Sequence, residues 1–492
     1  MQTEPTPHEG AALAPRSVSQ WGTIGQSFAI GPIFGVGFLS GTVAVFAGFN
    51  TPLAVLLAGA GAFALAYVLA MYGRRFAGAG AVYEYLAHGT RSSVGIIGAG
   101  TYVTGLLFLG AGGGFVAEGY LLNNLLAGEL SLQLGWAPWA LLSLAAAIGL
   151  NWVGVRIGVR TIVFTAGLSV APFLVIAVAV IADGGAAGNT IAVLDPGQTS
   201  LNDVFHGILF AVALFIGFET VAALGEEATA PRRTIPTAMI VSIVVCGCFF
   251  VLMTYVGAIG FGRVALQHNA WYASGNPFGE LGQRYVGHAL GWIVNLTIVL
   301  DLFSVCVAFT LAASRVLMAL SRDRLLPAGL GRTSRRFRTP AGGLATIAAW
   351  SLVVIGWAAI SHYGAARHIP NVLEAVLILS AAGSYLITLV YVVLAIGGLW
   401  LAWTDSDRRR LWWRIPVVLI AIAVPVLSFD GSLNPFPQYP DDIAVYAAAA
   451  GVGLTLVWYV ALRIWRSAAV AVAARHAERV LAPADEAPGV GS

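Results

Sequence analysis

Long apolar blocks constrain the fold of this chain more than any other feature of its sequence. Of the 492 residues, 58% are hydrophobic and only 10% are charged, whereas a soluble domain has roughly a quarter of its residues charged. The blocks run for about twenty residues or more, the length that a helix needs to cross about 30 Å of hydrocarbon. The short alternating strands of a membrane β-barrel are absent from the sequence. The sequence therefore predicts an all-α integral membrane protein.

We expect twelve transmembrane helices, whose orientation follows from arginine. The chain contains no lysine, so all 26 of its basic residues are arginine. All but Arg263, Arg284 and Arg367 fall on one side of the expected spans, which predicts that this side is cytoplasmic. Both termini then lie in the cytoplasm, and the basic loop 321–338 is interpreted as an anchor at the inner leaflet. The expected spans lie near 21–46, 51–73, 94–123, 134–153, 159–182, 204–224, 236–262, 288–320, 341–360, 370–398, 412–430 and 442–465.

The ends of the chain and its cysteines carry no predicted chemistry. Residues 1–20 contain acidic residues and lack an apolar core, which indicates a disordered tail and not a signal peptide. Residues 467–492 are Ala/Arg-rich and then Pro/Gly-rich, and are interpreted as a second tail. Cys246, Cys248 and Cys306 lie inside apolar blocks without a CxxC or Cys/His pattern, so we expect no metal site.

Two of the expected spans are interrupted. The first contains Gly31, Pro32, Gly35 and Gly37, and the sixth contains Gly217 followed by Glu219. Proline removes a backbone donor, and glycine adopts dihedral angles that other residues avoid. In hydrocarbon, each unpaired backbone group costs several kcal/mol unless a cavity or a ligand satisfies it.

Interruptions in spans one and six, at equivalent points of two halves, are typical of an inverted-repeat transporter. The amides freed by such breaks suit a carboxylate, and the freed carbonyls suit an ammonium group or a sodium ion. The alternative interpretation is that these glycines only allow close packing of helices.

Three regions carry specific motifs: span six with the segment after it, span eight with the loop after it, and the loop after span two. The motifs are Phe215-Ile216-Gly217-Phe218-Glu219, Leu224-Gly225-Glu226-Glu227-Ala228, Pro231-Arg232-Arg233-Thr234-Ile235-Pro236, Ala313-Ser314-Arg315-Val316-Leu317, Ser321-Arg322-Asp323-Arg324-Leu325-Leu326-Pro327 and Ala77-Gly78-Ala79-Gly80-Ala81-Val82-Tyr83-Glu84-Tyr85. The motifs of spans six and eight closely resemble the hallmarks of the amino acid–polyamine–organocation permeases. The loop after span two is a looser match that lacks a proline common in the family. The resemblance extends over about residues 20–400.

The resemblance implies a five-plus-five inverted repeat with broken helices one and six over 21–398, and two peripheral helices over 399–466. It also implies an amino acid site between the breaks. The α-carboxylate would bind amides around Gly35, Val36 and Gly37, and Phe215 and Phe218 would be aromatic gates or ordinary core. This sequence has Gly-Pro-Ile-Phe-Gly where many relatives have Gly-Ser-Gly. The ammonium would face carbonyls near Ile30 and Gly31 and those from Ala213 to Ile216.

The driving ion is left open between sodium and protons. Proton-coupled relatives often carry a lysine in span five, where this chain has Ser169. Ser169 could complete a sodium site with carbonyls of span one and with Thr310 or Ser314 of span eight, because hard cations prefer oxygen ligands.

Acids within the spans offer the rival mechanism. Any of four acids could carry a proton or hold a substrate ammonium: Glu118, Glu219, Asp301 and Glu374. Glu219 and Asp301 are the main candidates, and a helix cap is the alternative for Glu219. Glu118 and Glu374 are interpreted as reaching the outer vestibule. His206 is interpreted as a helix-end histidine, and a proton relay is the less favoured alternative.

The resulting prediction is a secondary active transporter for an amino acid or a related small amine, and not an enzyme, since HExxH and GxSxG motifs are absent. A polyamine or organocation exchanger, a transporter-like sensor and a channel remain alternatives. No cofactor is expected beyond Na⁺ or H⁺, and the partners are a small solute and membrane lipid, without nucleic acid. The high content of arginine and alanine and the absence of lysine indicate a bacterial protein. We therefore expect it in the plasma membrane of a bacterium. The solute and the oligomeric state are left open.

Overall fold

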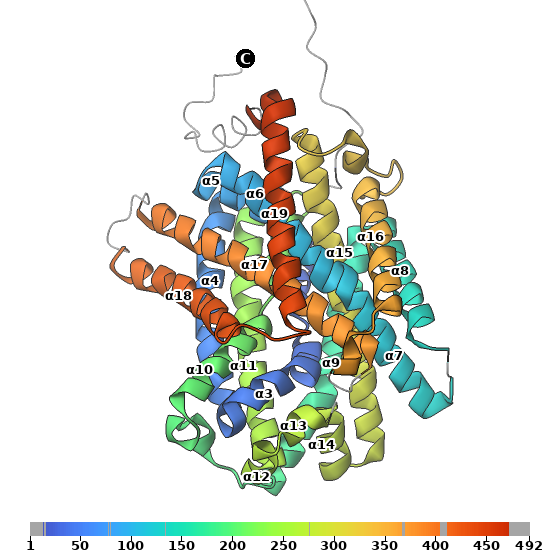
Figure 1. Cartoon of the computed structure of the whole chain (residues 1–492), viewed down its shortest axis with the longest axis vertical. Coiled ribbons are helices and arrows are strands. Elements are labelled where there is room, and N and C mark those ends of the chain that lie inside the picture. Colours follow the sequence, from blue (N-terminus) through green and yellow to red (C-terminus); the bar gives the residue numbers. More distant parts are fainter. Residues whose placement is uncertain are drawn as a thin grey trace, which may run out of the picture.

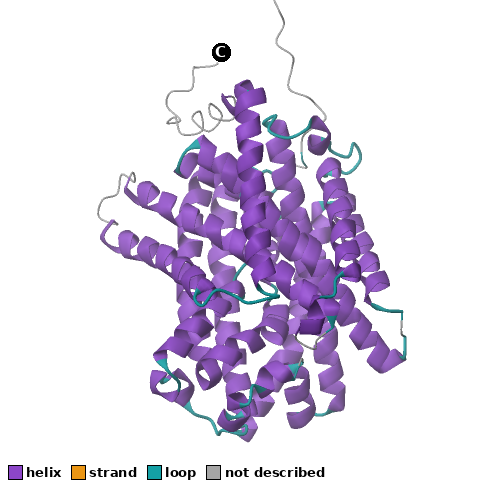
Figure 2. Ribbon diagram, in the orientation of Figure 1, coloured by secondary structure: helices purple, strands orange, loops and turns teal. Residues whose placement is uncertain are grey.

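The chain is a bundle of long helices with loops mainly at its two ends (Figure 2). The structure is a computed structural model that describes residues 13, 16–76, 78, 80–132, 134–274, 276–366, 370–403 and 411–471. Within these residues, eleven helical stretches are long and apolar enough to cross a membrane. The stretch Gln20–Arg75 contains the first two expected spans, and each of the other ten coincides with one expected span. The predicted all-α membrane class is confirmed.

The helices alternate between long spans and short segments at breaks or surfaces. They are α1 (Gln20–Ser27), η1 (Phe28–Ile30), α2 (Pro32–Phe34), η2 (Gly35–Leu39), α3 (Ser40–Ala47), η3 (Gly48–Asn50), α4 (Thr51–Arg75), α5 (Val82–Gly89), α6 (Ser92–Phe108), η4 (Leu109–Gly113), α7 (Gly114–Leu130), α8 (Trp136–Val153), α9 (Val155–Asp183), η5 (Ile191–Leu194), η6 (Pro196–Gln198), α10 (Leu201–Ala213), η7 (Phe218–Leu224), α11 (Pro231–Phe261), α12 (Arg263–Gln267), α13 (Ala270–Ala273), α14 (Pro277–Tyr285), α15 (His288–Arg322), η8 (Ala328–Gly331), α16 (Ala341–Ile360), η9 (Tyr363–Ala366), α17 (Asn371–Trp403), α18 (Leu411–Leu433) and α19 (Asp442–Trp465).

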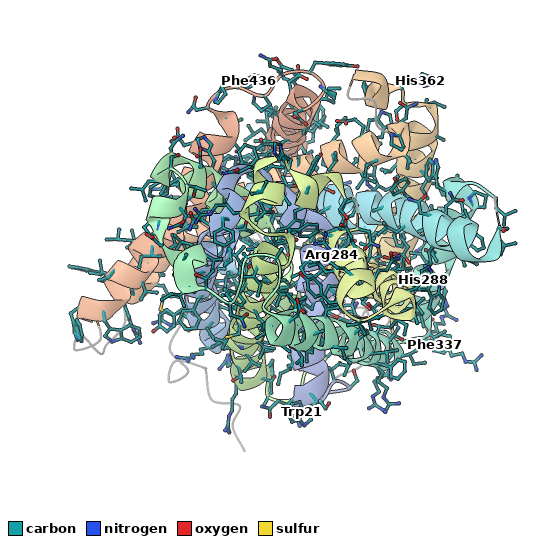
Figure 3. All side chains as sticks on the ribbon, turned by 90° about the horizontal axis from the view of Figure 1, so that it is seen from below. Trp21, Arg284, His288, Phe337, His362 and Phe436 are labelled. Carbon is teal, nitrogen blue, oxygen red and sulfur yellow. The ribbon has the colours of Figure 1, made fainter. Side chains whose placement is uncertain are left out.

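The two ends of the bundle differ in charge. We call the end with α5 and the C-terminal end of α19 the arginine-rich end, because α4, α15 and α19 finish there with Arg75, Arg322 and Arg463 (Figure 1). The short helices α12, α13 and α14 lie at the opposite end (Figure 1). Figure 3 looks onto that opposite end and shows Arg284 and His288 at the turn between α14 and α15.

The first span breaks at Gly31, whose φ of 66° lies in the left-handed region. An L residue with a Cβ rarely adopts this conformation, so the helix that starts at Gln20 ends there. Pro32 then restarts the helix at its first position, where its missing N–H is not needed. The chain continues as the π-helical turn η2 and as α3.

The sixth span breaks at Gly217, and the two breaks touch. α10 ends at Ala213, Gly217 has a φ of 120°, and the chain continues as the 3₁₀ helix η7. A Cβ placed on Gly217 would lie 2.7 Å from the carbonyl oxygen of Ala29. The backbones of the two interrupted spans therefore meet in the middle of the bundle.

Contacts between the long helices are related in pairs. α4 packs along α11, so the second and seventh expected spans are neighbours. α9 packs along α15 and α17 packs along α6, which pairs span five with eight and span ten with three. Exchanging the first five spans for the next five converts each of the last two contacts into the other, as an inverted repeat requires. α18 and α19 lie at the edge of the bundle, and most of their residues are not buried (Figure 1).

Part of the predicted tail 1–20 is ordered. Val18 forms a parallel bridge with Ala228, donating its amide to the carbonyl of Glu227 at 2.9 Å and accepting the amide of Thr229 at 2.9 Å. Residues 1–12, 14–15 and 472–492 of the two predicted tails lie outside the described residues, as do Ala77 and Ala79.

Gly217 tests whether the contact between the breaks is required for folding. We expect Gly217→Ala to destabilise the protein by roughly 1–3 kcal/mol, because its φ is unfavourable for alanine and the methyl group would press on Ala29. Thermal denaturation of the purified protein measures this effect. Gly149→Ala is the control, because a Cβ there meets nothing within 4 Å. Equal melting temperatures for the two variants would contradict the prediction.

Candidate functional site

Asp301 of α15 binds the free amides at the first break. Its Oδ2 accepts the amides of Ile33 and Phe34, each at 2.9 Å. These amides belong to the first turn after Gly31, where the helix itself supplies no acceptor. The side chain is 1% exposed, and its Oδ1 has no hydrogen-bond partner.

The residues predicted to bind a substrate carboxylate sit one turn further along the chain. The amide of Gly35 donates to the carbonyl of Gly31 at 2.7 Å. Val36 and Gly37 are buried in η2, and a Cβ on Gly37 would lie 2.6 Å from Ile298 of α15. Gly37 therefore packs against α15, and the free amides of this break donate to Asp301.

Glu219 plays a similar part at the second break. Its Oε2 accepts the amide of Gly217 at 3.0 Å, and its Oε1 accepts the hydroxyl of Tyr102 at 3.2 Å. The side chain is fully buried. These contacts correspond to the helix-cap interpretation of Glu219, and Tyr102 is a partner that sequence reasoning missed.

The predicted ammonium ligands and gates surround the same breaks. The carbonyls of Gly31 and Ala213 each accept an amide of their own segment. Phe215 packs edge-on against Phe250 of α11 with ring centroids 5.1 Å apart, and Phe218 lies 6.2 Å from the ring of Tyr391.

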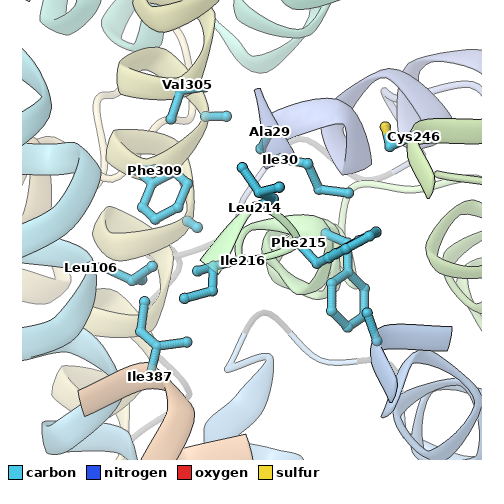
Figure 4. Close-up of a cluster of buried hydrophobic side chains, with 14 of the residues drawn as sticks. Ala29, Ile30, Leu106, Leu214, Phe215, Ile216, Cys246, Val305, Phe309 and Ile387 are labelled. Atoms are coloured by element: carbon cyan, nitrogen blue, oxygen red, sulfur yellow. The ribbon is translucent and has the colours of Figure 1, made fainter. Parts of the chain in front are cut away.

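Ile30 and Ile216 are part of the packed interior at the breaks. Both are buried, and Figure 4 shows Ile216 beside Leu106, Phe309 and Ile387, with Phe215 directed to the other side of the chain.

The three residues predicted for sodium do not meet. Ser169 donates to the carbonyls of Thr165 at 2.7 Å and Thr297 at 3.2 Å. Thr310 is thirteen residues beyond Thr297 on α15, about 20 Å along the helix at 1.5 Å per residue. Thr310 has an unpaired buried hydroxyl, whereas Ser314 donates to the carbonyl of Leu311 at 2.9 Å. One ion cannot contact both Ser169 and Thr310, so the combination proposed from the sequence is wrong.

Two predicted vestibule acids are instead buried. Glu118 is 1% exposed and Glu374 is fully buried, so neither side chain reaches an open outer surface. His206 lies near the surface of α10 with its Nδ1 2.8 Å from the carbonyl of Asn202, as expected of a helix-end histidine.

An ion pair closes the arginine-rich end. Arg315, which belongs to the span-eight motif, lies inside α15 with 2% exposure. Its Nε and Nη2 donate to the two carboxylate oxygens of Glu227, at 2.5 and 3.0 Å. Glu227 is also the residue whose carbonyl accepts Val18. The pair joins two of the sequence motifs, Gly-Glu-Glu and Ala-Ser-Arg, whose contact the sequence alone did not show.

Glu84 also lies at the arginine-rich end, in α5 between α4 and α6. It accepts the amides of Gly78 at 2.9 Å and Gly80 at 3.1 Å. Burial raises the pKa of its carboxyl from 4.5 to about 7, in spite of these two amides, and the charges of Glu226 and Asp323 add to the shift.

Comparison with known proteins places this arrangement in a family. A family model described as amino acid permease matches residues 19–459, from the start of α1 into α19. The chain belongs to the amino acid permease family. Its members are permeases and not enzymes, which confirms the family predicted from the sequence and the prediction that the protein is not an enzyme.

Named relatives of this permease match it over shorter stretches. The branched-chain amino acid permease BcaP of Lactococcus lactis subsp. cremoris (strain MG1363) is 29% identical over 158 residues, 32% of this chain and 33% of the relative. Cationic amino acid transporter 3, mitochondrial, of Arabidopsis thaliana is 30% identical over 135 residues, 27% of this chain and 21% of the relative. The chain thus covers a third or less of these two proteins. An uncharacterized transporter of Mycobacterium tuberculosis (strain ATCC 25618 / H37Rv) is 25% identical over 371 residues, 72% of this chain and 75% of the relative.

The ion pair of this permease makes a prediction about stability. We expect Arg315→Met to destabilise the protein by about 3–5 kcal/mol, because it leaves the buried carboxylate of Glu227 without its cation. The double variant Arg315→Met/Glu227→Met removes both charges and should be the more stable of the two. Thermal unfolding compares them.

The exposed pair Arg322–Glu226 is the matched control. Its residues are 26% and 36% exposed, so Arg322→Met should cost about 1 kcal/mol or less. Similar losses for Arg322→Met and Arg315→Met would contradict the assignment.

Glu84 makes the stability depend on pH. With a folded pKa of about 7 against 4.5, the folded chain binds more protons than the unfolded chain between these values. Stability should therefore fall as pH rises from about 4.5 to about 7 and level off above it. The side chain keeps some solvent contact, so the loss should stay below about 3 kcal/mol. Melting temperatures at pH 5 and pH 8 should differ less for Glu84→Gln than for the wild type, whereas Glu280→Gln on the exposed face of α14 should follow the wild type.

Proposed function

We propose that this permease is a secondary active transporter that takes up an amino acid or a related small amine by alternating access. The observation that carries the proposal is the contact between the two broken spans, Gly217 against Ala29, in the middle of the bundle. Backbone interrupted at membrane depth is tolerated only where it is buried in protein or lines a cavity, and transporters place their sites there.

The arginine-rich end supports a closed state on that side. The bridge of Val18 with Ala228 and the pair Arg315–Glu227 tie the start of α1 and the end of α15 to the segment after η7. Opening a path on this side requires these contacts to separate. We propose that this side is the cytoplasm of a bacterial cell, with both termini in it, as the arginine distribution predicts.

The names of the relatives support an amino acid as the solute. One relative is named for branched-chain and another for cationic amino acids, and an amine is common to both classes. A polyamine or organocation exchanger is the second candidate, because Asp301 already occupies amides that would otherwise suit a substrate carboxylate. We also propose that solute transport is coupled to Na⁺, to H⁺ or to the exchange of another solute.

Transport in proteoliposomes tests this function. We expect uptake of labelled L-leucine or L-arginine to saturate with concentration, and to accelerate when the same solute is present inside. Replacing sodium by choline, or adding a protonophore, identifies the driving ion. Flux that rises linearly without exchange would indicate a channel, and binding without flux would indicate a sensor. Protein-free liposomes are the control.

A further inference from the structure

A surface cavity lies beside α12, at the end of the bundle opposite to the arginine-rich end (Figure 1). Its volume is about 410 Å³. Three segments form its walls: η3 after the first span, residues 186–192 after α9, and the turn from α11 into α12. None of these segments contains the breaks at Gly31 and Gly217. The cavity is therefore separate from the candidate site in the middle of the bundle.

Arg263, the first residue of α12, gives this cavity a positive charge. Among the described residues that line the cavity, it is the only charged one. Its guanidinium lies over the ring of Phe49 in η3, 5.1 Å from the ring centroid. The side chain forms no hydrogen bond or ion pair with a described residue. A guanidinium that lies flat on a ring keeps its N–H donors at its edge, so these donors are available to an acceptor from outside the chain.

The wall around Arg263 is almost entirely apolar. Four alanines and two phenylalanines contribute to it, and Thr190 is the only other described lining residue with a polar side chain. The hydroxyl oxygen of Thr190 already accepts the amide of Ala192 at 3.1 Å. Val264 in the wall is 70% exposed, and Ile191 between two lining residues is 85% exposed. Apolar surface of this kind is stabilised when hydrocarbon covers it.

We infer that this cavity binds an anionic amphiphile, a molecule with one acidic head group and a short hydrocarbon part. The head group accepts hydrogen bonds from the edge of the Arg263 guanidinium, and the hydrocarbon part lies against the alanines of the wall. The inference goes beyond the proposed function, because it concerns a second site and does not depend on which solute is transported.

The chemistry of the cavity excludes other classes of ligand. An amine would be repelled by the guanidinium of Arg263 and would find no carboxylate among the described lining residues. A metal ion would also lack ligands there, since the described residues contain no group of three metal-ligating side chains. An inorganic anion would bind the guanidinium but leave the apolar wall uncovered. An amphiphile satisfies both the charge and the wall.

A ligand in this cavity joins segments that are far apart in the sequence. η3 follows the first span, residues 186–192 follow span five, and α12 follows span seven. The guanidinium on Phe49 is already one contact between η3 and α12. An amphiphile that contacts all three segments stabilises their present arrangement, because it loses contacts when they separate.

Probe binding to the purified full-length protein tests the inference without requiring transport. Hexanoate and hexylamine, which have the same chain length and opposite charges, are titrated into phosphatidylcholine nanodiscs while thermal stability is followed at constant pH and ionic strength. We expect hexanoate to raise the melting temperature in a saturable manner and hexylamine to leave it unchanged. Arg263→Gln should weaken hexanoate binding roughly tenfold, because it removes a charge-assisted hydrogen bond.

A second variant tests the apolar wall with the charge intact. Ala192→Leu fills the cavity and should also weaken hexanoate binding, although Arg263 is unchanged. Arg284→Gln is the control, because Arg284 lies at the same end of the bundle and its Nη1 donates to the carbonyl of Gly260 at 3.3 Å. This variant should keep wild-type affinity. Unchanged hexanoate affinity in Arg263→Gln, or equal stabilisation by hexanoate and hexylamine, would overturn the inference.

Nanodiscs of different composition distinguish the source of the head group. Stabilisation by hexanoate in phosphatidylcholine supports a soluble acid as the ligand. A higher melting temperature in phosphatidylglycerol without hexanoate, lost in both Arg263→Gln and Ala192→Leu, supports the acidic head group of a lipid. If neither hexanoate nor phosphatidylglycerol stabilises the wild type more than these two variants, the cavity is not a site for anionic amphiphiles.

Discussion

The structure depends on how backbone groups are satisfied where its membrane helices stop. Hydrocarbon supplies no hydrogen bonds, so a helix that ends in mid-membrane leaves amides that must find acceptors within the protein. Here the acceptors are carboxylates: Asp301 takes two amides after Gly31, and Glu219 takes the amide of Gly217. An isolated buried carboxylate is itself costly, and the amides that need an acceptor compensate part of that cost. The breaks and the acids therefore stabilise one another.

The two carboxylates differ in what they have left to offer. Glu219 receives an amide on one oxygen and the hydroxyl of Tyr102 on the other, so both of its oxygens have donors. Asp301 receives both amides on a single oxygen and keeps the second one unpartnered. The sequence makes these acids look equivalent, since each lies within an apolar span. Their surroundings make Glu219 a structural cap and Asp301 a cap with a free acceptor.

Much of the fold was predictable because hydropathy and backbone chemistry are local. The lengths of the apolar blocks determine the spans, and Gly31-Pro32 and Gly217 mark the breaks by their own conformational limits. The site was less predictable, because its contacts join residues far apart in the chain. Asp301 reaches Ile33 across 268 residues, and Arg315 reaches Glu227 across 88. The predicted sodium site failed for the same reason: Ser169 of α9 contacts Thr297 of α15, and Thr310 lies thirteen residues further along α15, about 20 Å away at 1.5 Å per residue.

The buried acids at the arginine-rich end and those in the middle of the bundle differ in their partners. At the arginine-rich end, the guanidinium of Arg315 donates to both oxygens of the buried acid Glu227, so the charge of Glu227 is compensated within the protein. In the middle of the bundle, Glu118 and Asp301 each keep one buried oxygen without a hydrogen-bond partner. α15 carries both Asp301 and Arg315, and a shift of this one helix on binding would act directly on the ion pair that closes the arginine-rich end. A ligand changes a conformational equilibrium only through contacts that differ between the two states, and α15 provides such contacts at both places.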